Sequence, residues 1–176
     1  MDNEAKGTKK VTRLIVCDTG PLLHLSEAGM ISLLQQAGDI LIPPAVSIEL
    51  ERQVTGWNSL DWLSIHQLES EYIKNAQAWV STNQLDPGEA EAIGLALQVK
   101  ADWLLTDDAQ ARRFAERLAL EVHGSVGLFL WAVAAGYIND HDQAHAALDD
   151  LASSSLWISK RVLREARKAI DILFEN

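Results

Sequence analysis

Residues 13–21 have the sequence RLIVCDTGP, in which an apolar run ends at a cluster of turn-forming residues. A short apolar run bounded by turn residues is typical of a strand that is buried on both faces, as in a parallel sheet. Similar runs recur along the chain at residues 40–42, 62–68, 103–106 and 121–123. Segments with helical spacing separate these runs, and the alternation predicts an α/β fold with a largely parallel sheet.

Helices are predicted between these strands and after the last one. Their expected ranges are 22–36 with a break near Gly29, 45–53, 71–82, 87–100, 109–118, 126–135, 140–151 and 159–173. The clearest start is at Pro87, because Asp86 and Glu89 have the spacing of a capping box. We predict three parts in the chain: a loose N-terminal arm over residues 1–10, an α/β domain over 11–125 and a C-terminal helical extension over 126–176 that packs on the same domain.

The composition excludes several classes of protein. The chain has 176 residues, of which 48% are hydrophobic and 23% charged, as in an ordinary globular protein. Cys17 is the single cysteine, so the sequence excludes an internal disulfide and a cysteine zinc cluster and predicts a reducing, cytoplasmic location. We expect no membrane association, because no apolar run reaches about 18 residues and residues 1–10 lack a secretory signal.

The net charge of −10 is concentrated in the body of the chain. Residues 11–158 contain 7 basic and 20 acidic side chains, whereas both ends are weakly basic. A body this acidic repels nucleic acid unless cations intervene, which argues against a plain DNA-binding module. It suits a hard divalent metal, so a metal-dependent enzyme and an acidic partner-binding protein are the classes that remain.

Acidic residues lie at or near the carboxyl ends of the predicted strands, where the functional crevice of an open parallel sheet is found. They come from four segments: Asp18, Glu49, the pair Glu89 and Glu91, and the pair Asp107 and Asp108. Clustered carboxylates raise one another's pKa unless a cation neutralises them, and Mg²⁺ or Mn²⁺ prefers such oxygen ligands. A divalent ion can activate water and stabilise charge on a phosphate, so the pattern predicts hydrolysis of a phosphodiester or phosphate ester.

Each acid taken alone has a simpler interpretation. Asp18 precedes Thr-Gly-Pro and is also a good turn former, while Glu89 and Asp108 are also good helix caps. Glu49, judged alone, is typical of the solvated face of an amphipathic helix. The functional hypothesis therefore depends on the joint placement of these residues.

Four motifs occur in order, and each contains one of the acids or pairs of acids. They are Asp18-Thr-Gly-Pro, Pro44-x-Val-x-x-Glu49, LDPGEAEAIGLA over residues 85–96, and Leu104-Leu-Thr-Asp-Asp108. Their order and spacing over about residues 13–125 resemble the PIN-domain family. The helix start GEAEAI resembles the prokaryotic branch that contains the VapC-like toxins of toxin–antitoxin pairs.

The resemblance implies a fold, a reaction and a set of site residues. The fold would be a three-layer α/β/α arrangement with a mostly parallel central sheet of about four to five strands and C-terminal helices. The activity would be that of a metal-dependent single-strand ribonuclease, with Mg²⁺ or Mn²⁺ as the cofactor and products that carry 5′-phosphate and 3′-hydroxyl ends. The metal-binding and catalytic acids would be Asp18, Glu49, Glu89 and Asp108, with Asp107 as an adjacent candidate and Thr19 and Thr106 as supporting hydroxyls. RNA would be the substrate, an antitoxin protein a partner, and a homodimer the expected assembly.

The choice between Glu89 and Glu91 follows from helix geometry. Glu89 and Glu91 are two positions apart, which separates their side chains by about 200° around the helix axis. The two side chains therefore cannot face the site equally. Glu89 shares its face with Ala92, Ile93 and Ala96, which must turn toward the sheet. We therefore prefer Glu89 and keep Glu91 in reserve.

Basic residues are scarce, and one group follows the last acidic motif. Arg112, Arg113 and Arg117 lie on the helix predicted to start after Asp108. They are candidates for RNA phosphate contacts, although a solvated face with salt bridges explains them somewhat better. A second basic group on the last predicted helix suits RNA, an acidic partner or the acidic body of the chain, and the sequence does not choose among these.

Two histidines and one tryptophan are further candidates for binding, of a metal and of a base respectively. His141 and His145 have the i,i+4 spacing of a zinc pair, but no third ligand is evident, so the pattern favours an exposed helix face. Among the tryptophans, Trp57 in a Gly-Trp-Asn-Ser loop is the candidate for base stacking, although a loop anchor explains it better.

Three other functions compete with the ribonuclease. A catalytically weak PIN-like protein would bind nucleic acid or a partner without cleaving. A phosphatase of the haloacid-dehalogenase type would use Asp18 as nucleophile, but Gly20 stands where such sites have a second aspartate. A receiver-like signalling domain has its acidic pair after the first strand, whereas Asp107 and Asp108 come late in this chain.

Overall fold

The structure, a computed structural model, describes residues 12–54 and 60–175. The predicted arm over residues 1–10 and the loop residue Trp57 lie outside the described residues. In chain order the elements are β1 (Leu14–Cys17), α1 (Thr19–Glu27), α2 (Ser32–Ala37), β2 (Asp39–Ile42), α3 (Pro44–Gln53), β3 (Leu63–Ile65), α4 (Ser70–Ser81), α5 (Pro87–Val99), β4 (Trp103–Leu105), α6 (Ala109–Arg117), β5 (Val122–His123), α7 (Ser125–Ala134), α8 (His141–Ala152) and α9 (Lys160–Glu175).

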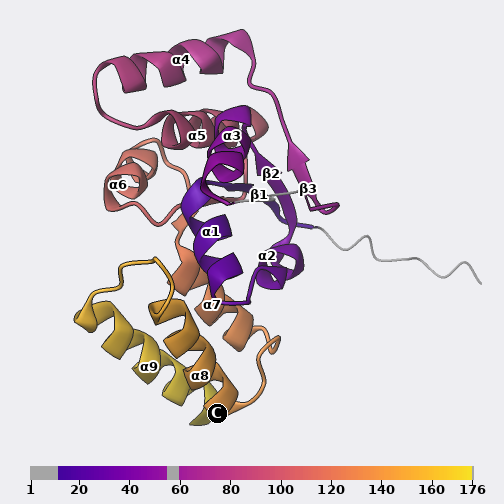
Figure 1. Cartoon of the computed structure of the whole chain (residues 1–176), viewed down its shortest axis with the longest axis vertical. Coiled ribbons are helices and arrows are strands. Elements are labelled where there is room, and N and C mark those ends of the chain that lie inside the picture. The colour runs from indigo at the N-terminus through magenta and orange to yellow at the C-terminus, as the bar shows by residue number, and fades with distance from the viewer. Residues whose placement is uncertain (1–11, 55–59, 176) are drawn as a thin grey trace, which may run out of the picture.

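The five strands form one parallel sheet in the order β3-β2-β1-β4-β5. Helices cover it on both sides, with α4 and α5 above the sheet and α7, α8 and α9 below it in the view of Figure 1. The predicted three-layer α/β/α architecture with a parallel sheet is therefore confirmed.

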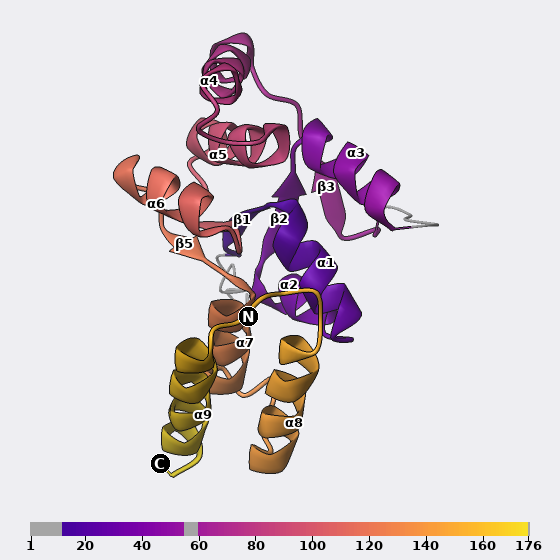
Figure 2. The same ribbon diagram turned by 60° about the vertical axis from the view of Figure 1, so that its left-hand side comes forward.

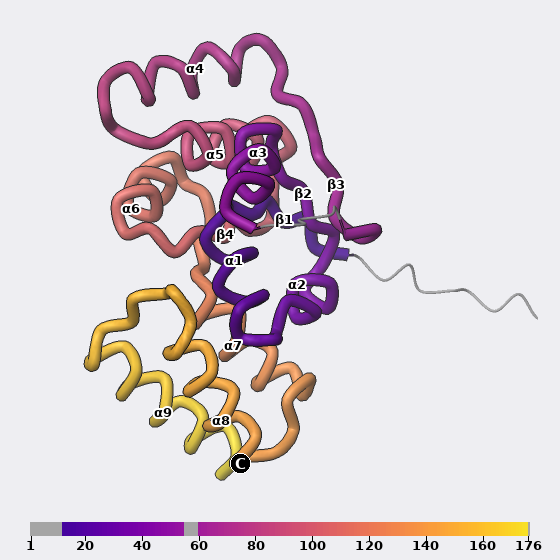
Figure 3. The backbone as a smooth tube through the Cα atoms, viewed as in Figure 1, coloured from indigo at the N-terminus to yellow at the C-terminus, as the bar shows by residue number. Residues whose placement is uncertain are grey.

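The central strand is buried on both faces, as its unbroken apolar sequence predicts. Ile15 and Cys17 belong to one hydrophobic core, and Val16 between them belongs to the other. This alternation follows from the two-residue period of a strand. The core around Val16 is closed by α5, and α4 packs on the outer side of α5, away from the sheet (Figure 3).

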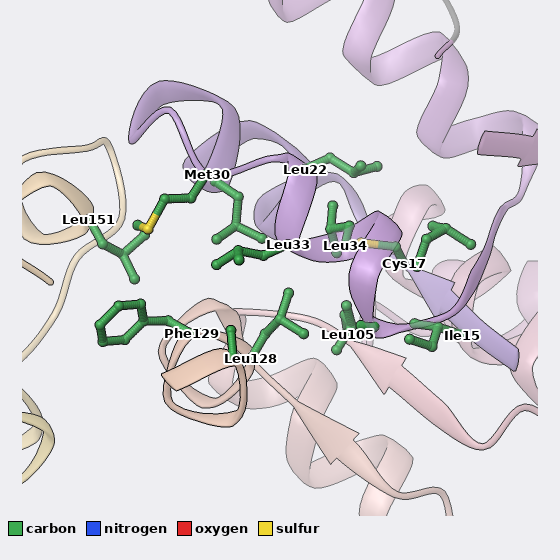
Figure 4. Close-up of a cluster of buried hydrophobic side chains, with 14 of the residues drawn as sticks. Ile15, Cys17, Leu22, Met30, Leu33, Leu34, Leu105, Leu128, Phe129 and Leu151 are labelled. Atoms are coloured by element: carbon green, nitrogen blue, oxygen red, sulfur yellow. The ribbon is translucent and has the colours of Figure 1, made fainter. Parts of the chain in front are cut away.

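The opposite core extends from the sheet into the C-terminal helices. Figure 4 shows Leu105 of β4, Leu34 of α2 and Leu128 of α7 around this core. Phe129 and Leu151 continue it toward α8, and both side chains are fully buried. Helices α7, α8 and α9 lie side by side below the sheet (Figure 2) and bury their facing surfaces against one another.

The strand order creates a reversal point at the centre of the sheet. From β1 the chain moves outward through β2 to β3, and it then crosses back to β4 on the other side of β1. The carboxyl ends of β1 and β4 are therefore adjacent, while their connections leave in opposite directions. This is the place where open α/β sheets bind ligands.

The first helix begins earlier than predicted. We expected it from Leu22, but α1 begins at Thr19, with Asp18 as its N-cap. Pro21 lies in the first turn, where a backbone N–H has no partner within the helix, so proline does not interrupt it there. Among the described residues, no helix combines the length and the apolar character that crossing a membrane requires.

Candidate active site

Asp18 lies at the reversal point and is held by three groups. Its backbone N–H donates to the carbonyl of Leu105 at 2.9 Å, which joins the ends of β1 and β4. Its side chain accepts from the Thr19 N–H at 2.7 Å and from the Thr106 hydroxyl at 2.9 Å. The carboxylate is thus fixed in direction and is buried, with 7% of the residue exposed.

The surroundings of Asp18 oppose its ionisation. Burial raises the pKa of Asp18 to about 7, although the hydrogen bonds from Thr19 and Thr106 act in the opposite direction. The negative charges of Asp86 and Glu49 add to the rise. Asp18 therefore lies within the electrostatic reach of two other acids, and neutralisation by a cation or a proton is favourable there.

Glu49 reaches the same place from α3. One of its carboxylate oxygens accepts from the Thr19 hydroxyl at 2.5 Å, so Thr19 contacts both acids, through its backbone to Asp18 and through its side chain to Glu49. A Cβ on Gly88 would lie 2.6 Å from each Glu49 carboxylate oxygen. Gly88 therefore leaves the space that the Glu49 carboxylate occupies.

The start of α5 contributes Asp86 and Glu89. The predicted capping box is present: the Glu89 N–H donates to Asp86 at 2.8 Å, and the Asp86 N–H donates to Glu89 at 3.0 Å. Burial raises the pKa of Glu89 to about 7, and the charges of Asp86, Asp108 and Asp18 add to the rise. Glu89 thus lies within the electrostatic reach of the acids that follow β1 and β4.

The two glutamates of α5 are engaged at different places. Glu91 accepts from the backbone N–H of Ala45 at 2.9 Å and so caps the first turn of α3. Glu89 instead interacts with the acids of the sheet edge. Sequence reasoning treated Asp86 only as a cap, although its charge also acts on Asp18 and Glu89. Its position in the same LDPGE motif was the available signal.

The adjacent residues Asp107 and Asp108 point to different partners. Asp108 caps α6, with one carboxylate oxygen accepting from the N–H groups of Gln110 at 2.7 Å and Ala111 at 2.8 Å. Asp107 accepts from the Ser125 N–H at 2.7 Å and the Ser125 hydroxyl at 2.6 Å, and it pairs with His24 at 2.7 Å. Asp107 therefore ties the end of β4 to α1 and α7.

The hydrogen bonds of Asp107 also keep it ionised. Burial raises its pKa, but the bonds from His24 and Ser125 outweigh burial and leave the pKa below its ordinary value. Asp18, which is buried, and Asp107, which is partly buried, thus have opposite pKa shifts. The carboxyl of Asp107 pairs with a histidine, whereas the side-chain partners of Asp18 are uncharged donors.

The donor atoms at this edge fit a hard divalent ion. They are carboxylate oxygens, which Mg²⁺ and Mn²⁺ prefer. The absence of a side chain at Gly88 leaves room for one of these carboxylates, that of Glu49. In the described part of the chain, no three carboxylates bring oxygens within 4.8 Å of one another. An ion at this edge would therefore be bound directly by one or two of the carboxylates, as Mg²⁺ commonly is, and would meet the others through water.

The three arginines of α6 do not form one surface. Arg112 is half-buried and donates to the Thr106 carbonyl at 3.3 Å, and its buried Nε has no hydrogen-bond partner among the described residues. Arg113 and Arg117 are exposed. Only these two are therefore open to a phosphate from solvent without rearrangement.

A groove beside the site contains a tryptophan that sequence reasoning did not single out. Trp157 is 83% exposed and lines a hollow together with Asp107, Arg112 and Arg113. The residue lies in the connection between α8 and α9, so its nearness to α6 depends on the packing of the C-terminal helices. No local sequence signal distinguishes it from a buried tryptophan.

Comparison with known proteins identifies the fold family. A family model described as a PIN domain matches residues 14–171, which include every acid of the site and extend into α9. The search of curated proteins gave no match.

Proposed function

Because the chain belongs to the PIN-domain family, whose members are typically nucleases, we propose that it is a metal-dependent endoribonuclease acting on single-stranded RNA. The observation that carries this proposal is the buried carboxyl of Asp18, whose pKa is raised to about 7 within reach of other acids. Such a carboxyl is neutralised by a proton or a cation. A divalent cation is also what hydrolysis of a phosphodiester requires.

Four acids would hold one or two Mg²⁺ or Mn²⁺ ions, directly or through water: Asp18, Glu49, Glu89 and Asp108. When bound, the ion would supply activation of water and stabilisation of charge on the phosphate. Asp107 and Glu91 stay outside this set, because both oxygens of Asp107 are bonded to His24 and Ser125 and Glu91 is held at the start of α3, whereas Asp108 uses one oxygen for its cap.

The other residues of the site would position these acids. The Thr106 hydroxyl holds one oxygen of Asp18, and the Thr19 hydroxyl holds one oxygen of Glu49. Fixed donors of this kind reduce the reorganisation needed during the reaction. Both threonines are therefore positioning residues in this proposal.

The RNA would approach over α6 and the connection that contains Trp157. Arg113 and Arg117 would contact phosphates, and Trp157 would offer an exposed ring for base stacking. Arg112 would not contact the RNA but would hold the Thr106 carbonyl at the end of β4 through its hydrogen bond. The strongly acidic body explains why binding of RNA would require the metal ion.

A toxin role in a cytoplasmic toxin–antitoxin pair is the finer part of the proposal. It rests on the GEAEAI helix start and on the acidic pocket, which an antitoxin segment containing Arg or Lys would neutralise. A homodimer is part of the same expectation. A small reading frame beside the gene that encodes a DNA-binding antitoxin would support it.

The direct experiment is cleavage of single-stranded RNA by the purified chain. We expect cleavage with Mn²⁺ or Mg²⁺, none with EDTA, and none in Asp18→Asn. Asp39→Asn is the matched control, because Asp39 is exposed at the opposite edge of the sheet, at the start of β2. Cleavage that survives EDTA and Asp18→Asn would overturn the proposal. RNA binding without cleavage would favour the weak binding protein, and hydrolysis of p-nitrophenyl phosphate but not of RNA would favour the phosphatase.

A further inference from the structure

A second group of metal-binding side chains lies far from the acidic edge, between α8 and α9. It consists of His141, His145 and Asp171, whose ligand atoms all lie within 4.8 Å of one another. Among the described residues, this is the one group of three or more such side chains that meets this spacing. The third ligand, which the sequence did not reveal, is contributed by the next helix.

Both imidazoles point to one carboxylate oxygen. The Nε2 atoms of His141 and His145 lie 3.0 and 2.8 Å from Oδ1 of Asp171. Ligands of a tetrahedral zinc ion at ordinary bond lengths are separated by about 3.3 Å. Each imidazole therefore needs to move away from Asp171 by only a few tenths of an ångström to make room for an ion, and all three ligand atoms already lie within 4.8 Å of one another.

From this geometry we propose that His141, His145 and Asp171 form a binding site for a divalent transition metal of the zinc class, with water as the fourth ligand. Two imidazoles and one carboxylate suit Zn²⁺, Co²⁺ or Ni²⁺, whereas Mg²⁺ prefers oxygen ligands alone. The side chains of His141 and Asp171 are 48% and 49% exposed, so an ion and its water can enter from solvent.

The surroundings hold the ligands in this orientation. The Nδ1 atom of His141 lies 3.2 Å from the Asp142 carboxylate, which leaves Nε2 as the ligand atom in the manner of metal-bound histidines. The ring of Phe174 packs edge-on against the other side of His141, with centroids 5.7 Å apart. A carboxylate and an aromatic ring thus fix the ring of His141, the more exposed of the two histidines.

The two helices are fixed by contacts other than the cluster. Leu148 of α8 and Ile170 of α9 are fully buried in the shared core. Arg167 pairs with Asp149 across the same interface, and Lys168 lies 3.7 Å from Glu165, so these cations of α9 have other acids as partners. The site is therefore preorganised by packing and does not depend on the ion for its shape.

Bound metal would join the C-terminal helix to α8. This site is independent of the proposed nuclease activity, because its ligands, its donor chemistry and its place in the fold all differ from those of the acidic edge. It would tie α9, the element with the second basic group of the sequence, to the helical layer below the sheet.

Isothermal titration of Zn²⁺ into the full chain, in a large excess of Mg²⁺ to occupy the acidic edge, tests the proposal. We expect one Zn²⁺ per chain in the wild type and in His66→Ala, a matched control that removes an exposed histidine near the end of β3. His145→Ala and Asp171→Asn should lose this site, and Asp142→Asn should weaken it roughly tenfold.

Two further measurements keep the result interpretable. Circular dichroism of the metal-free variants establishes whether they fold. If His145→Ala does not fold, the nearly isosteric Asp171→Asn carries the test alone. Co²⁺ should give the intense visible bands of a four-coordinate site in the wild type and in Asp18→Asn, and not in Asp171→Asn. Failure of the wild type to bind Zn²⁺ in excess Mg²⁺, or equal binding by His145→Ala and Asp171→Asn, would overturn the proposal.

Discussion

The carboxyl edge of the sheet and the α8–α9 cluster both gather metal-binding side chains, but their settings differ. At the sheet edge, the charges of Asp86 and Glu49 act on a buried carboxyl, Asp18, whose side-chain partners among the described residues are the uncharged donors of Thr19 and Thr106. In the cluster, an exposed aspartate already has two imidazoles as partners. At the edge, burial and neighbouring charges therefore oppose the ionisation of Asp18, whereas the carboxylate of Asp171 in the cluster has hydrogen-bond partners without a metal ion.

This difference separates what a metal would do in each region. At the edge an ion would relieve repulsion among carboxylates and so would contribute to both stability and chemistry. In the cluster an ion would replace hydrogen bonds that exist without it and would change little else. The predictions below test the edge, from the largest expected effect to the smallest.

Asp18→Asn should have the largest effect on activity. Replacing the buried carboxylate by an amide removes the charge that the ion needs, so we expect RNA cleavage to fall by at least about 100-fold, which corresponds to about 2.7 kcal/mol of transition-state stabilisation. The initial rate with Mn²⁺ measures it. A rate within about threefold of that of Asp39→Asn would remove Asp18 from the site.

The stability of the metal-free chain should fall as pH rises. The pKa of Asp18 is about 7 in the folded chain against an ordinary 3.8, and that of Glu89 is about 7 against 4.5. Between pH 4 and 7 the folded state therefore binds more protons than the unfolded state, so the contribution of these groups is complete below their ordinary pKa values and is lost as pH approaches 7.

For Asp18 alone the loss is on the order of 2–4 kcal/mol. Urea unfolding at pH 5 and pH 8 measures it as the difference between the wild type and Asp18→Asn. Mg²⁺ should restore the stability of the wild type at pH 8 and leave that of Asp18→Asn nearly unchanged. A wild-type to variant difference that does not change with pH would contradict the proposed environment of Asp18.

Gly88→Ala should damage the edge without removing an acid. The added Cβ would lie 2.6 Å from the carboxylate oxygens of Glu49, so this carboxylate must shift from its place beside Thr19. We expect reduced cleavage with a change of less than about 1 kcal/mol in the free energy of unfolding, because the end of a flexible side chain can move at little cost and alanine favours the helix. Gly127→Ala in α7 is the control, because its Cβ would meet His123 only at an ordinary 3.8 Å. Equal cleavage by the two variants would show that the space at Gly88 is not needed.

Glu89→Gln and Glu91→Gln form a matched pair with the smallest expected effects. Glutamine can keep the capping box of α5 at position 89 and can accept from Ala45 at position 91, so neither change should unfold the chain. We expect cleavage to fall about tenfold for the first variant and to stay unchanged for the second. The reverse result would make Glu91 the third acid.

The sequence predicted most of the fold because its strands are short apolar runs that end at turn residues. RLIVC and WLL lie in strands as expected, and the capping box at Asp86 began α5 at Pro87, whereas the pairing of β1 with β4 came from the structure alone. The strand predicted over 62–68 is only Leu63–Ile65, because a strand at the edge of the sheet has one neighbour to pair with. Local patterns decide local structure, and they failed where tertiary pairing sets the length.

The candidate site was predictable in outline and not in its contacts. The edge position of Asp18 and Asp108 follows from where their strands end. The contact between Asp107 and His24 could not be predicted in this way, because the two residues are 83 positions apart in the sequence. Asp171 likewise meets His145 only because α9 packs on α8. Contacts between distant segments depend on packing geometry, which no local spacing encodes.

A crystal of the chain soaked in Mn²⁺, with an anomalous difference map recorded at the manganese edge, tests the central claim most directly. The account predicts a peak at the carboxylate of Asp18, shared with at least one of Glu49, Glu89 and Asp108. The absence of any peak at Asp18, or manganese found solely between His141, His145 and Asp171, would contradict it.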